Sequence, residues 1–375
     1  MKLVKHNIYL NELVLIFLLG VFSFSSAQTN IKKQHWGNVG GKPVYLYSLT
    51  NANGMCLELT NFGGIITSIF VPDKDGNMAD VVLGYDNLQQ YIDPNPSMGA
   101  IIGRFANRIR NGKFTIDGQT YQVTVDKKGH ALHGGLEFEK ALWDGKIVKN
   151  KMGNGIKLQY CSKNGKHGFP GNVSATVTYT LTDENAIHVK FEAETDKTTH
   201  VNMTQHSYFN LSGVKELIYN HILSIDANEY TELDSDAVPT GEIQPLRGKA
   251  WDLKEMTRIG DKIHDIPLNG YHHCYVLNKP LDSLRKVVKV IEPKSGRMLE
   301  VYTTQPGIVL YASNVLSDSI VGKYGIKYQP HAAFCIETQH YPDTPNYSNF
   351  PSTLLHPGEK YEETAIYDFG ISHLE

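Results

Sequence analysis

Basic residues are not in excess in this chain of 375 residues, since 36 Lys and Arg stand against 39 Asp and Glu. Proteins that bind nucleic acid without regard to its sequence depend on Lys and Arg to neutralise phosphates, so the charge balance argues against that class. Glycine and proline number only 33 and 16, too few for a collagen-like or disordered chain. The composition is that of a globular protein.

Cysteine is scarce, and its four positions are far apart: Cys56, Cys161, Cys274 and Cys335. This spacing excludes a dense disulfide framework and any CxxC motif for metal binding or redox chemistry. Lone cysteines are most often buried free thiols, and we expect that state here. If the protein is exported, the formation of one disulfide bond stays possible.

Long apolar runs are also missing, with one exception near the start of the chain. Lys2 and Lys5 precede an apolar segment at 13–22, and Ser25-Ser26-Ala27 offers small residues for cleavage before Gln28. The apolar segment is too short to span a bilayer, so residues 1–27 are predicted to be a cleaved export signal. We expect residues 28–375 to form one domain in the periplasm or outside the cell, without a membrane span.

The dominant pattern is an alternation of apolar and polar residues with a period of two. Every second residue is apolar from Val173 to Leu181, and after a polar turn the pattern resumes from Ile187 to Ala193. Such alternation predicts a β-hairpin with one buried face. Similar short runs lie at Val44–Thr50, Cys56–Thr60, Ile65–Val71, Gln119–Val125, Ile156–Tyr160, Val287–Glu292, Met298–Thr304 and Ala333–Glu337.

Helical periodicity is limited to two short segments, Asn87–Ile92 and Leu253–Ile259. Strands do not alternate with long helical segments, which argues against a doubly wound α/β fold and a TIM barrel. No repeat of fixed length is present, which argues against a propeller. The sequence therefore predicts an all-β protein, one large and mostly antiparallel β-sandwich of many short strands.

The familiar motifs of nucleotide, zinc-protease and serine-hydrolase sites are absent. Asp73-Lys74-Asp75-Gly76 resembles the start of a calcium loop, but the Glu that should end such a loop is missing. Asp and Gly are ordinary turn residues, so we expect a hairpin turn there.

Polar residues are concentrated in three segments at expected strand ends, namely 103–109 with 132–135, 202–210 and 335–342. In an extended strand His206 shares a face with Thr204 and Tyr208. A histidine flanked by apolar residues is usually structural. Glu337 is more informative, because a carboxylate within Ala-Phe-Cys-Ile-Glu is costly to bury unless it has a partner or a task.

At these segments the sequence resembles the aldose 1-epimerases, also called galactose mutarotases. The similarity covers nearly the whole chain after the predicted export signal, and it includes Asn61–Gly64, Gly103–Ile109, Leu132–Gly135, Gln205–Leu211, Pro239–Glu242, Thr304–Gly307, Glu337–Pro342 and Asn349–Pro351. Each motif alone is weak, but their order and combination are specific. The resemblance implies a β-supersandwich that interconverts the α and β anomers of a free aldose, such as galactose or glucose, without a cofactor.

The resemblance also implies a role for individual residues. His206 matches the general acid of the family and Glu337 its general base. The residues that match sugar-holding positions are Asn107, Arg108, His133, Tyr208 and Gln305. These two catalytic roles are chemically reasonable, because ring opening requires a proton to leave the C1 hydroxyl and another to reach the ring oxygen, and a carboxylate and an imidazolium can do this near neutral pH.

One segment departs from the family. The family commonly reads Gly-Tyr-Asp-His-Asn where this chain reads Gly270-Tyr271-His272-His273-Cys274. His272 therefore stands in the place of an Asp that accepts a sugar hydroxyl, which leaves the identity of the sugar open. We expect His272 to line the sugar site. A His-His-Cys metal site is disfavoured, because successive strand side chains face opposite ways.

Three other functions stay open from the sequence. The first two are a same-fold epimerase for a different sugar or sugar acid, and a non-catalytic carbohydrate-binding protein. The presence of both His206 and Glu337 favours catalysis, because binding alone needs no acid–base pair. The third, a glycosidase, would usually need two carboxylates across the cleft, and only Glu337 lies in a matching motif. The expected partner is a small-molecule sugar, and the oligomeric state is left open.

Overall fold

The computed structural model describes residues 29–150, 152–278, 280 and 283–372. The predicted export signal at residues 1–27 lies outside the described residues. Within them, β-strands dominate, and every pair of neighbouring strands in the sheets is antiparallel. This confirms the all-β prediction.

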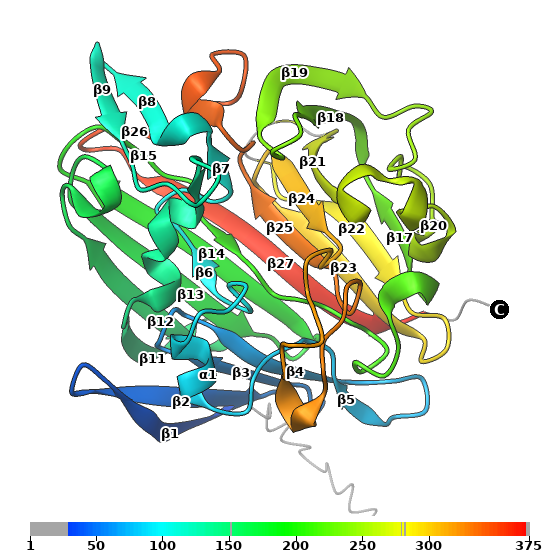
Figure 1. Cartoon of the computed structure of the whole chain (residues 1–375). Helices are drawn as coiled ribbons and strands as arrows, with labels where there is room; N and C mark the ends of the chain where they lie inside the picture. The colour runs from blue at the N-terminus through cyan, green and yellow to red at the C-terminus, as the bar shows by residue number, and fades with distance from the viewer. Residues whose placement is uncertain (1–28, 151, 279, 281–282, 373–375) are drawn as a thin grey trace, which may run out of the picture.

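A nine-stranded sheet crosses the whole molecule (Figure 1). Its strands, in spatial order, are β11 (Asp144–Asn150), β12 (Gly153–Ser162), β13 (Val173–Leu181), β14 (Ala186–Thr195), β27 (Tyr361–Ile371), β23 (Arg297–Thr303), β22 (Arg285–Ile291), β17 (Ile222–Ile225) and β20 (Thr257–Arg258). The strand β27, near the end of the chain, lies between β14 and β23, so it joins the two halves of this sheet.

Two five-stranded sheets pack against the large one. The first is formed by β1 (Asn30–Val39), β2 (Lys42–Thr50), β3 (Cys56–Thr60), β4 (Ile66–Pro72) and β5 (Met78–Asp80). The second has the order β19 (Pro239–Pro245), β18 (Ala227–Leu233), β21 (His272–Leu277), β24 (Gly307–Tyr311) and β25 (Cys335–Gln339). A single core cluster contains buried residues from all three sheets, including Leu57, Val177 and Leu310.

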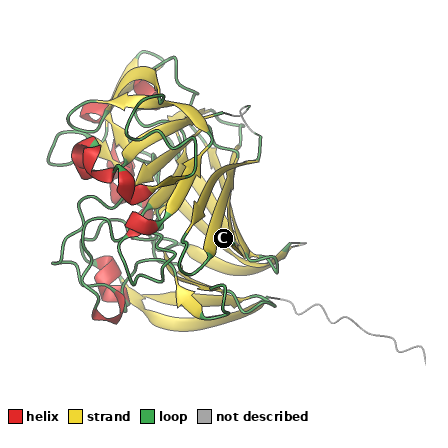
Figure 2. Ribbon diagram, turned by 90° about the vertical axis from the view of Figure 1, so that its right-hand side faces the viewer, coloured by secondary structure: helices red, strands yellow, loops and turns green. Residues whose placement is uncertain are grey.

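Four short strand pairs and a few helical turns complete the described structure. The pairs are β6 (Ile101–Ile102) with β16 (Thr204–Gln205), β7 (Arg108–Ile109) with β10 (Ala131–Leu132), β8 (Lys113–Ile116) with β9 (Gln119–Gln122), and β15 (Thr199–His200) with β26 (Leu354–Leu355). The α-helix α1 (Leu88–Ile92) is joined by 3₁₀ turns such as η2 (His133–Leu136), η3 (Phe138–Lys140) and η10 (Thr344–Asn346). Figure 2 shows the helical turns gathered on one side of the stacked strands.

The hairpin predicted from alternation is confirmed in register. β13 begins at Val173 and ends at Leu181, and Val177 pairs with Phe191 of β14. The apolar residues of β13 are all buried, whereas Ser174 is exposed. The turn at 73–76 is confirmed as well, since the Asp73 carboxylate accepts the backbone N–H groups of residues 75 and 77 between β4 and β5.

The two helix predictions had different outcomes. α1 forms at Leu88–Ile92, and the side chain of Asn87 caps it by accepting the backbone N–H of Gln90. The helix predicted at Leu253–Ile259 is wrong, because Thr257 pairs with β17 and gives this segment strand hydrogen bonds instead. The strand predicted at Gln119–Val125 ends at Gln122. At Thr257 pairing with a distant segment overrides the local pattern.

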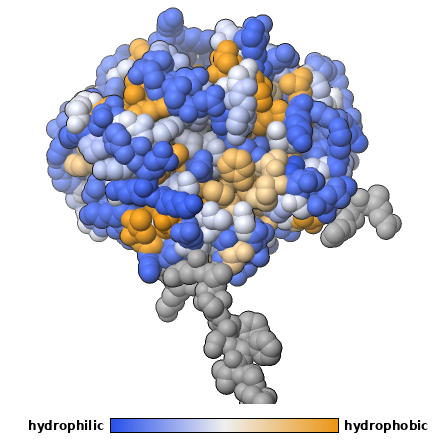
Figure 3. Space-filling model, turned by 90° about the horizontal axis from the view of Figure 1, so that it is seen from below, coloured by the Kyte–Doolittle hydropathy of each residue, from blue (hydrophilic) through white to orange (hydrophobic). Residues whose placement is uncertain are grey.

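No helix in the described residues is long and apolar enough to cross a bilayer. The face seen from below, where the β1–β5 sheet lies, is mostly hydrophilic, with several separate hydrophobic patches, one of them near its lower left edge (Figure 3). The large apolar residues that are exposed come from scattered positions in the chain, such as Met78, Met152 and Val315.

The four cysteines are all free thiols, as expected. Cys274 and Cys335 are buried, but Cys56 is half-buried and Cys161 is exposed. The prediction of burial is therefore wrong for Cys161, which lies opposite the exposed Ser174 on the outer face of the large sheet.

Candidate active site

The sheet β19-β18-β21-β24-β25 forms one wall of the candidate site. Paired residues on neighbouring strands share a face of the sheet. The register creates two rows on one face, His272–Tyr311–Cys335 and Cys274–Val309–Glu337. The alternate residues Ile308, Leu310 and Ile336 face the main core. The apolar face thus anchors the sheet, and the opposite face presents the predicted chemistry.

His206 reaches this wall from a different sheet. It follows β16 directly, and its backbone is bonded to Gly99 and Ala100. The imidazole is stacked on the ring of Tyr208, with centroids 5.1 Å apart and an interplanar angle of 23°. These contacts place Nε2 of His206 3.5 Å from Oε1 of Glu337. The two predicted catalytic residues therefore meet.

Glu337 is held in a strongly desolvated position, with only 2% of its surface exposed. Burial raises the pKa of its carboxyl group, and the nearby His206 and Arg108 oppose this shift. Oε1 faces His206, whereas Oε2 has no hydrogen-bond partner within the described ranges. A desolvated carboxylate is a stronger base than an exposed one, and a buried carboxylate oxygen without a partner is unusual unless it has a function.

Asn107 and His133 are locked to each other beside this pair. The backbone N–H of Asn107 donates to Nδ1 of His133 at 3.2 Å, and the backbone N–H of His133 donates to the Asn107 carbonyl. Because Nδ1 accepts, the ring proton is on Nε2. Burial and the neighbouring His206 and Arg108 hold the pKa of His133 well below its usual range. His133 is therefore a neutral hydrogen-bond donor, with its ring 5.3 Å from that of His206.

Arg108 and His272 form the other side of the site. Nη1 of Arg108 lies 3.5 Å from Nε2 of His272. A guanidinium can only donate, so Nε2 of His272 is the unprotonated nitrogen. Burial and the charge of Arg108 lower the pKa of His272 to about 3, which makes this ring neutral at pH 7. Nε of Arg108 is buried and has no hydrogen-bond partner in the part of the chain that the structure describes.

Gln305 connects the two segments that carry the catalytic pair. Its side-chain Nε2 donates to the carbonyls of Met203 at 3.1 Å and Thr338 at 2.9 Å. Met203 lies just before His206, and Thr338 follows Glu337. Oε1 of Gln305 has no hydrogen-bond partner among residues 29–372 as described. Contact between Gln305 and a sugar stays a prediction.

Tyr208 is almost completely buried, and its polar group is already engaged. The hydroxyl donates to the Pro96 carbonyl at 2.9 Å, while the ring lies against His206. In this arrangement the ring supports the imidazole. A contact between the Tyr208 hydroxyl and a sugar stays a prediction.

Sequence reasoning missed Tyr311. Its ring centroid lies 5.2 Å from that of His272 and 6.5 Å from that of His206. The strand Gly307–Tyr311 was not predicted, although the apolar run Gly-Ile-Val-Leu-Tyr is a pattern that a fully buried strand can show. An aromatic ring between these two imidazoles gives the site a flat apolar surface.

The residues of the metal-site alternative do not converge. His273 faces away from His272 and stacks on Trp251, with ring centroids 4.4 Å apart. Cys274 packs among Val309, Tyr341 and Phe350 instead. Among the described residues no group of three or more His, Cys, Asp or Glu side chains could hold a metal ion.

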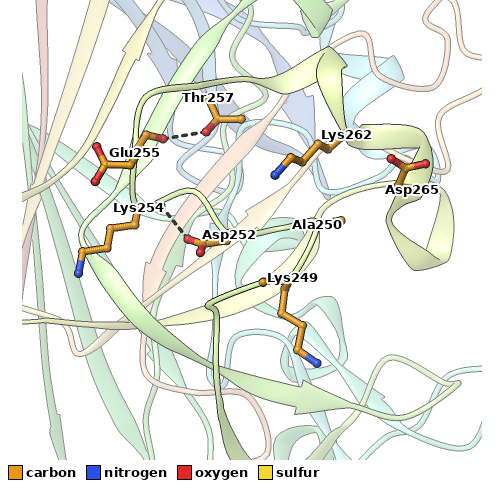
Figure 4. Close-up of a pocket in the computed structure, with 9 residues that line it drawn as sticks. Lys249, Ala250, Asp252, Lys254, Glu255, Thr257, Lys262 and Asp265 are labelled. Carbon is orange, nitrogen blue, oxygen red and sulfur yellow. Dashed lines mark hydrogen bonds between the residues drawn. The ribbon is translucent and has the colours of Figure 1, made fainter.

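A separate hollow of about 550 Å³ lies elsewhere on the surface, around the loop before β20 (Figure 4). Its lining carries side chains of both signs, with Lys249, Lys254 and Lys262 interspersed with Asp252 and Asp265. None of the predicted site residues lines it. Its open, mixed-charge lining contrasts with the desolvated pair at His206 and Glu337.

Comparisons with known proteins agree with this geometry. The family model described as aldose 1-epimerase matches residues 45–368. The human galactose mutarotase is 38% identical over 335 residues, covering 89% of this chain and 96% of the relative. The chain belongs to the aldose 1-epimerase family. The aldose 1-epimerase of Escherichia coli K12 is 33% identical over 339 residues, covering 88% of this chain and 96% of that protein.

The fold is also similar to that of solved structures of aldose epimerase homologues. The crystal structure of an aldose epimerase homologue from C. elegans superposes with a TM-score of 0.81 at 29% sequence identity, and it covers 88% of this chain and 99% of its own. The galactose mutarotase-like β-sandwich that the sequence implied is thereby confirmed. Membership of the aldose 1-epimerase family gives the contact between His206 and Glu337 a chemical context.

Proposed function

We propose that the protein is a mutarotase, which interconverts the α and β anomers of a free aldose such as galactose or glucose. The contact between His206 and Glu337 carries this proposal, together with the curated relatives named galactose mutarotase and aldose 1-epimerase. Both groups are buried and come from different sheets, and Nδ1 of His206 and Oε2 of Glu337 have no hydrogen-bond partner within the described residues.

The proposed reaction starts with removal of the C1 hydroxyl proton by the carboxylate of Glu337. Protonated His206 gives its proton to the ring oxygen as the bond between C1 and that oxygen breaks. The open-chain aldehyde then turns about the C1–C2 bond, and the ring closes on the other face of C1 with both proton transfers reversed. The atoms balance without a co-reactant, and each positioned acid or base typically contributes about 10²–10⁴-fold.

The distance within the pair suits this reaction. The C1 hydroxyl oxygen and the ring oxygen are bonded to the same carbon, so the acid and the base must reach neighbouring atoms. His206 and Glu337, with facing atoms 3.5 Å apart, can do so from one side of the site. A glycosidase instead needs two carboxyl groups about 5 Å or more apart across a bond. The alternative of a non-catalytic sugar-binding protein gives no reason to bury both groups together.

Sugar binding is assigned to the polar groups around this pair. Arg108 supplies charged donors, and His133 supplies one neutral donor through Nε2. His272 is neutral and can donate through Nδ1. Asn107, Tyr208 and Gln305 complete the proposed sugar-binding set, in which Gln305 offers its free Oε1 as an acceptor.

The test is polarimetry of freshly dissolved α-anomers of several aldoses, with and without the protein. A mutarotase shortens the decay to the equilibrium rotation and leaves the final rotation unchanged. If every aldose decays at its buffer rate while sugar binding is still measurable by calorimetry, the protein binds sugars without catalysis.

We also propose that residues 1–27 direct export and are cleaved near Ala27 and Gln28. The basic start, the short apolar segment and the small residues before Gln28 support this assignment. The remaining residues 28–375 then form one domain of the aldose 1-epimerase type. The position of β27 at the centre of the largest sheet supports a single domain, because the end of the chain completes a sheet begun before residue 150.

A further inference from the structure

The strand that carries Arg108 is too short to be rigid by itself. β7 consists of Arg108 and Ile109 only, and one of its edges is paired with β10. It is flanked by Asn107 and Asn111, which have φ values of 62° and 54°. Non-glycine residues are uncommon in this left-handed region, so the conformation needs support from neighbouring segments.

Asp343 provides that support on the other edge of β7. Its backbone N–H donates to the Arg108 carbonyl at 2.8 Å, and its Oδ1 accepts the backbone N–H of Arg110 at 2.9 Å. A parallel strand residue placed beside Ile109 would bond the same two groups. The carboxylate of Asp343 therefore acts in place of a main-chain carbonyl. We call these two hydrogen bonds the Asp343 clamp.

The burial and the backbone conformation of Asp343 both cost free energy of folding, which indicates that the residue has a specific function. The residue is fully buried, and its own φ is 58°. Its Oδ2 makes no hydrogen bond within the described part of the chain and lies 3.8 Å from Nε of Arg110. An ionised group buried in this way is expensive unless its charge or its hydrogen bonds are used.

The chain connects the clamp directly to the catalytic wall. Asp343 follows β25, the strand that presents Glu337, after the short segment His340–Pro342. The same stretch of chain thus delivers Glu337 to one side of the site and holds the backbone of Arg108 on the other. A shift of Asp343 would change the position of Arg108 relative to Glu337.

We propose that Asp343 is a positioning residue that fixes Arg108 for sugar binding. This inference rests on the proposed function, because it assumes that Arg108 binds the sugar. Asp343 itself touches neither His206 nor Glu337 through any hydrogen bond found in the described residues. Its effect on the reaction must therefore pass through residues 108–110.

The charged surroundings of Asp343 give the clamp a pH dependence. Burial raises the pKa of Asp343 to about 6, while Arg110 and His130 oppose the shift. Asp234 binds the other side of the Arg110 guanidinium at 2.8 Å, and Asp236 faces His130 at 3.8 Å. As pH falls through the pKa of Asp343, its charge is lost and its attraction for Arg110 weakens.

The test compares Asp343→Ala, which removes the Oδ1 acceptor of the clamp, with Asp234→Asn, which breaks an ion pair to the same Arg110 but leaves the clamp intact. Asp343→Ala should raise KM at least about fivefold with kcat within about twofold, because Arg108 binds ground state and transition state alike. Asp234→Asn should change KM less than about twofold. The ratio of KM between Asp343→Ala and wild type should shrink from pH 8 to pH 5, since the protonated wild-type carboxyl is a weaker hydrogen-bond acceptor than the carboxylate.

A double-mutant cycle decides whether the effect passes through Arg108. In an Arg108→Ala background, Asp343→Ala should change KM by less than about twofold. If Asp343→Ala does not fold, Asn346→Ala takes its place, because Nδ2 of Asn346 donates to Oδ1 of Asp343 at 2.6 Å and holds the carboxylate. Asn346→Ala should raise KM in the same direction and lose this effect in the Arg108→Ala background.

Two results would overturn the inference. One is a lower unfolding temperature with an unchanged KM, which would make Asp343 purely structural. The other is a pair of effects that multiply in the double variant, which would separate Asp343 from Arg108. A wild-type protein without mutarotase activity would instead count against the proposed function, so the two failures are distinguishable.

Discussion

Nε2 of His206 lies 3.5 Å from Oε1 of Glu337, although the strands next to them belong to different sheets. Gln305 links the two segments that carry this pair, because its side-chain amide donates hydrogen bonds to the backbone carbonyls of Met203 and Thr338. The pair is thus fixed by buried hydrogen bonds rather than by exposed loops. A site of this kind needs little rearrangement before it accepts a substrate.

The catalytic pair is tested by Glu337→Gln and His206→Asn. Each variant should lower kcat at least about 100-fold, because each removes one of the two proton transfers. Polarimetry with an α-aldose measures the loss. A variant that keeps more than about a tenth of the wild-type rate would show that the residue is not the acid or base assigned to it.

Thermal unfolding of Glu337→Gln provides the control for folding. The pKa of Glu337 is raised in the folded protein, so the folded state holds this proton more tightly than the unfolded chain does. Its contribution to stability is present at low pH and is lost as pH rises through the folded pKa. At pH 8 the variant should therefore unfold at the same temperature as the wild type or higher. A marked decrease would mean that the loss of rate reflects damage to the fold.

The pH dependence of kcat/KM should be bell-shaped. One group must be deprotonated and one protonated, and the two limbs report macroscopic values for the pair. The pKa of Glu337 is raised by burial, so the acid limb should lie above the ordinary value of 4.5. Initial rates between pH 4 and pH 10 measure both limbs. A profile that is flat from about pH 5 to pH 9 would contradict the division of roles.

His272→Asp should increase kcat/KM for galactose or glucose by about fivefold or more, since an Asp would pair with Arg108 and accept a sugar hydroxyl. His272 is neutral and lies 3.5 Å from Arg108, so the substitution adds one negative charge at a defined place. The matched control is His272→Asn, which offers a neutral acceptor. A change below about twofold, within ~0.4 kcal/mol, would mean that His272 does not set substrate choice.

Tyr208→Phe and Tyr208→Ala separate two roles of this side chain. The Phe variant keeps the ring against His206 but loses the hydrogen bond to Pro96, which should cost about 1 kcal/mol of stability and leave kcat within about threefold. The Ala variant loses the ring and should lower kcat at least about tenfold through a misplaced imidazole. Kinetics with thermal unfolding distinguish the two. A large rise in KM for Tyr208→Phe would instead favour a sugar contact by the hydroxyl.

Export is tested on the protein from its native host. N-terminal sequencing of the mature chain should begin at or near Gln28, because Ser25-Ser26-Ala27 is the best cleavage site after the apolar segment. Intact Met1 on protein from the cytoplasmic fraction would contradict the prediction.

The sequence alone was sufficient for the strands whose pattern is local. The alternation at Val173–Leu181 defined β13 to the residue, because a strand with one buried face must place an apolar side chain at every second position. The helix predicted at Leu253–Ile259 failed for the opposite reason. Its backbone is bonded to β17, a segment about 35 residues earlier, and no local pattern records such a pairing.

Which residues carry the chemistry could also be inferred from the sequence, because motif order identified the family and placed His206, Glu337 and Arg108 within it. Their distances, protonation states and supports depended on the tertiary structure. The pKa shift of Glu337, the neutral state of His272 and the clamp by Asp343 all arise from burial and from groups on distant strands. Electrostatic effects of this kind depend on which charges are brought together away from water, and only the folded chain decides that.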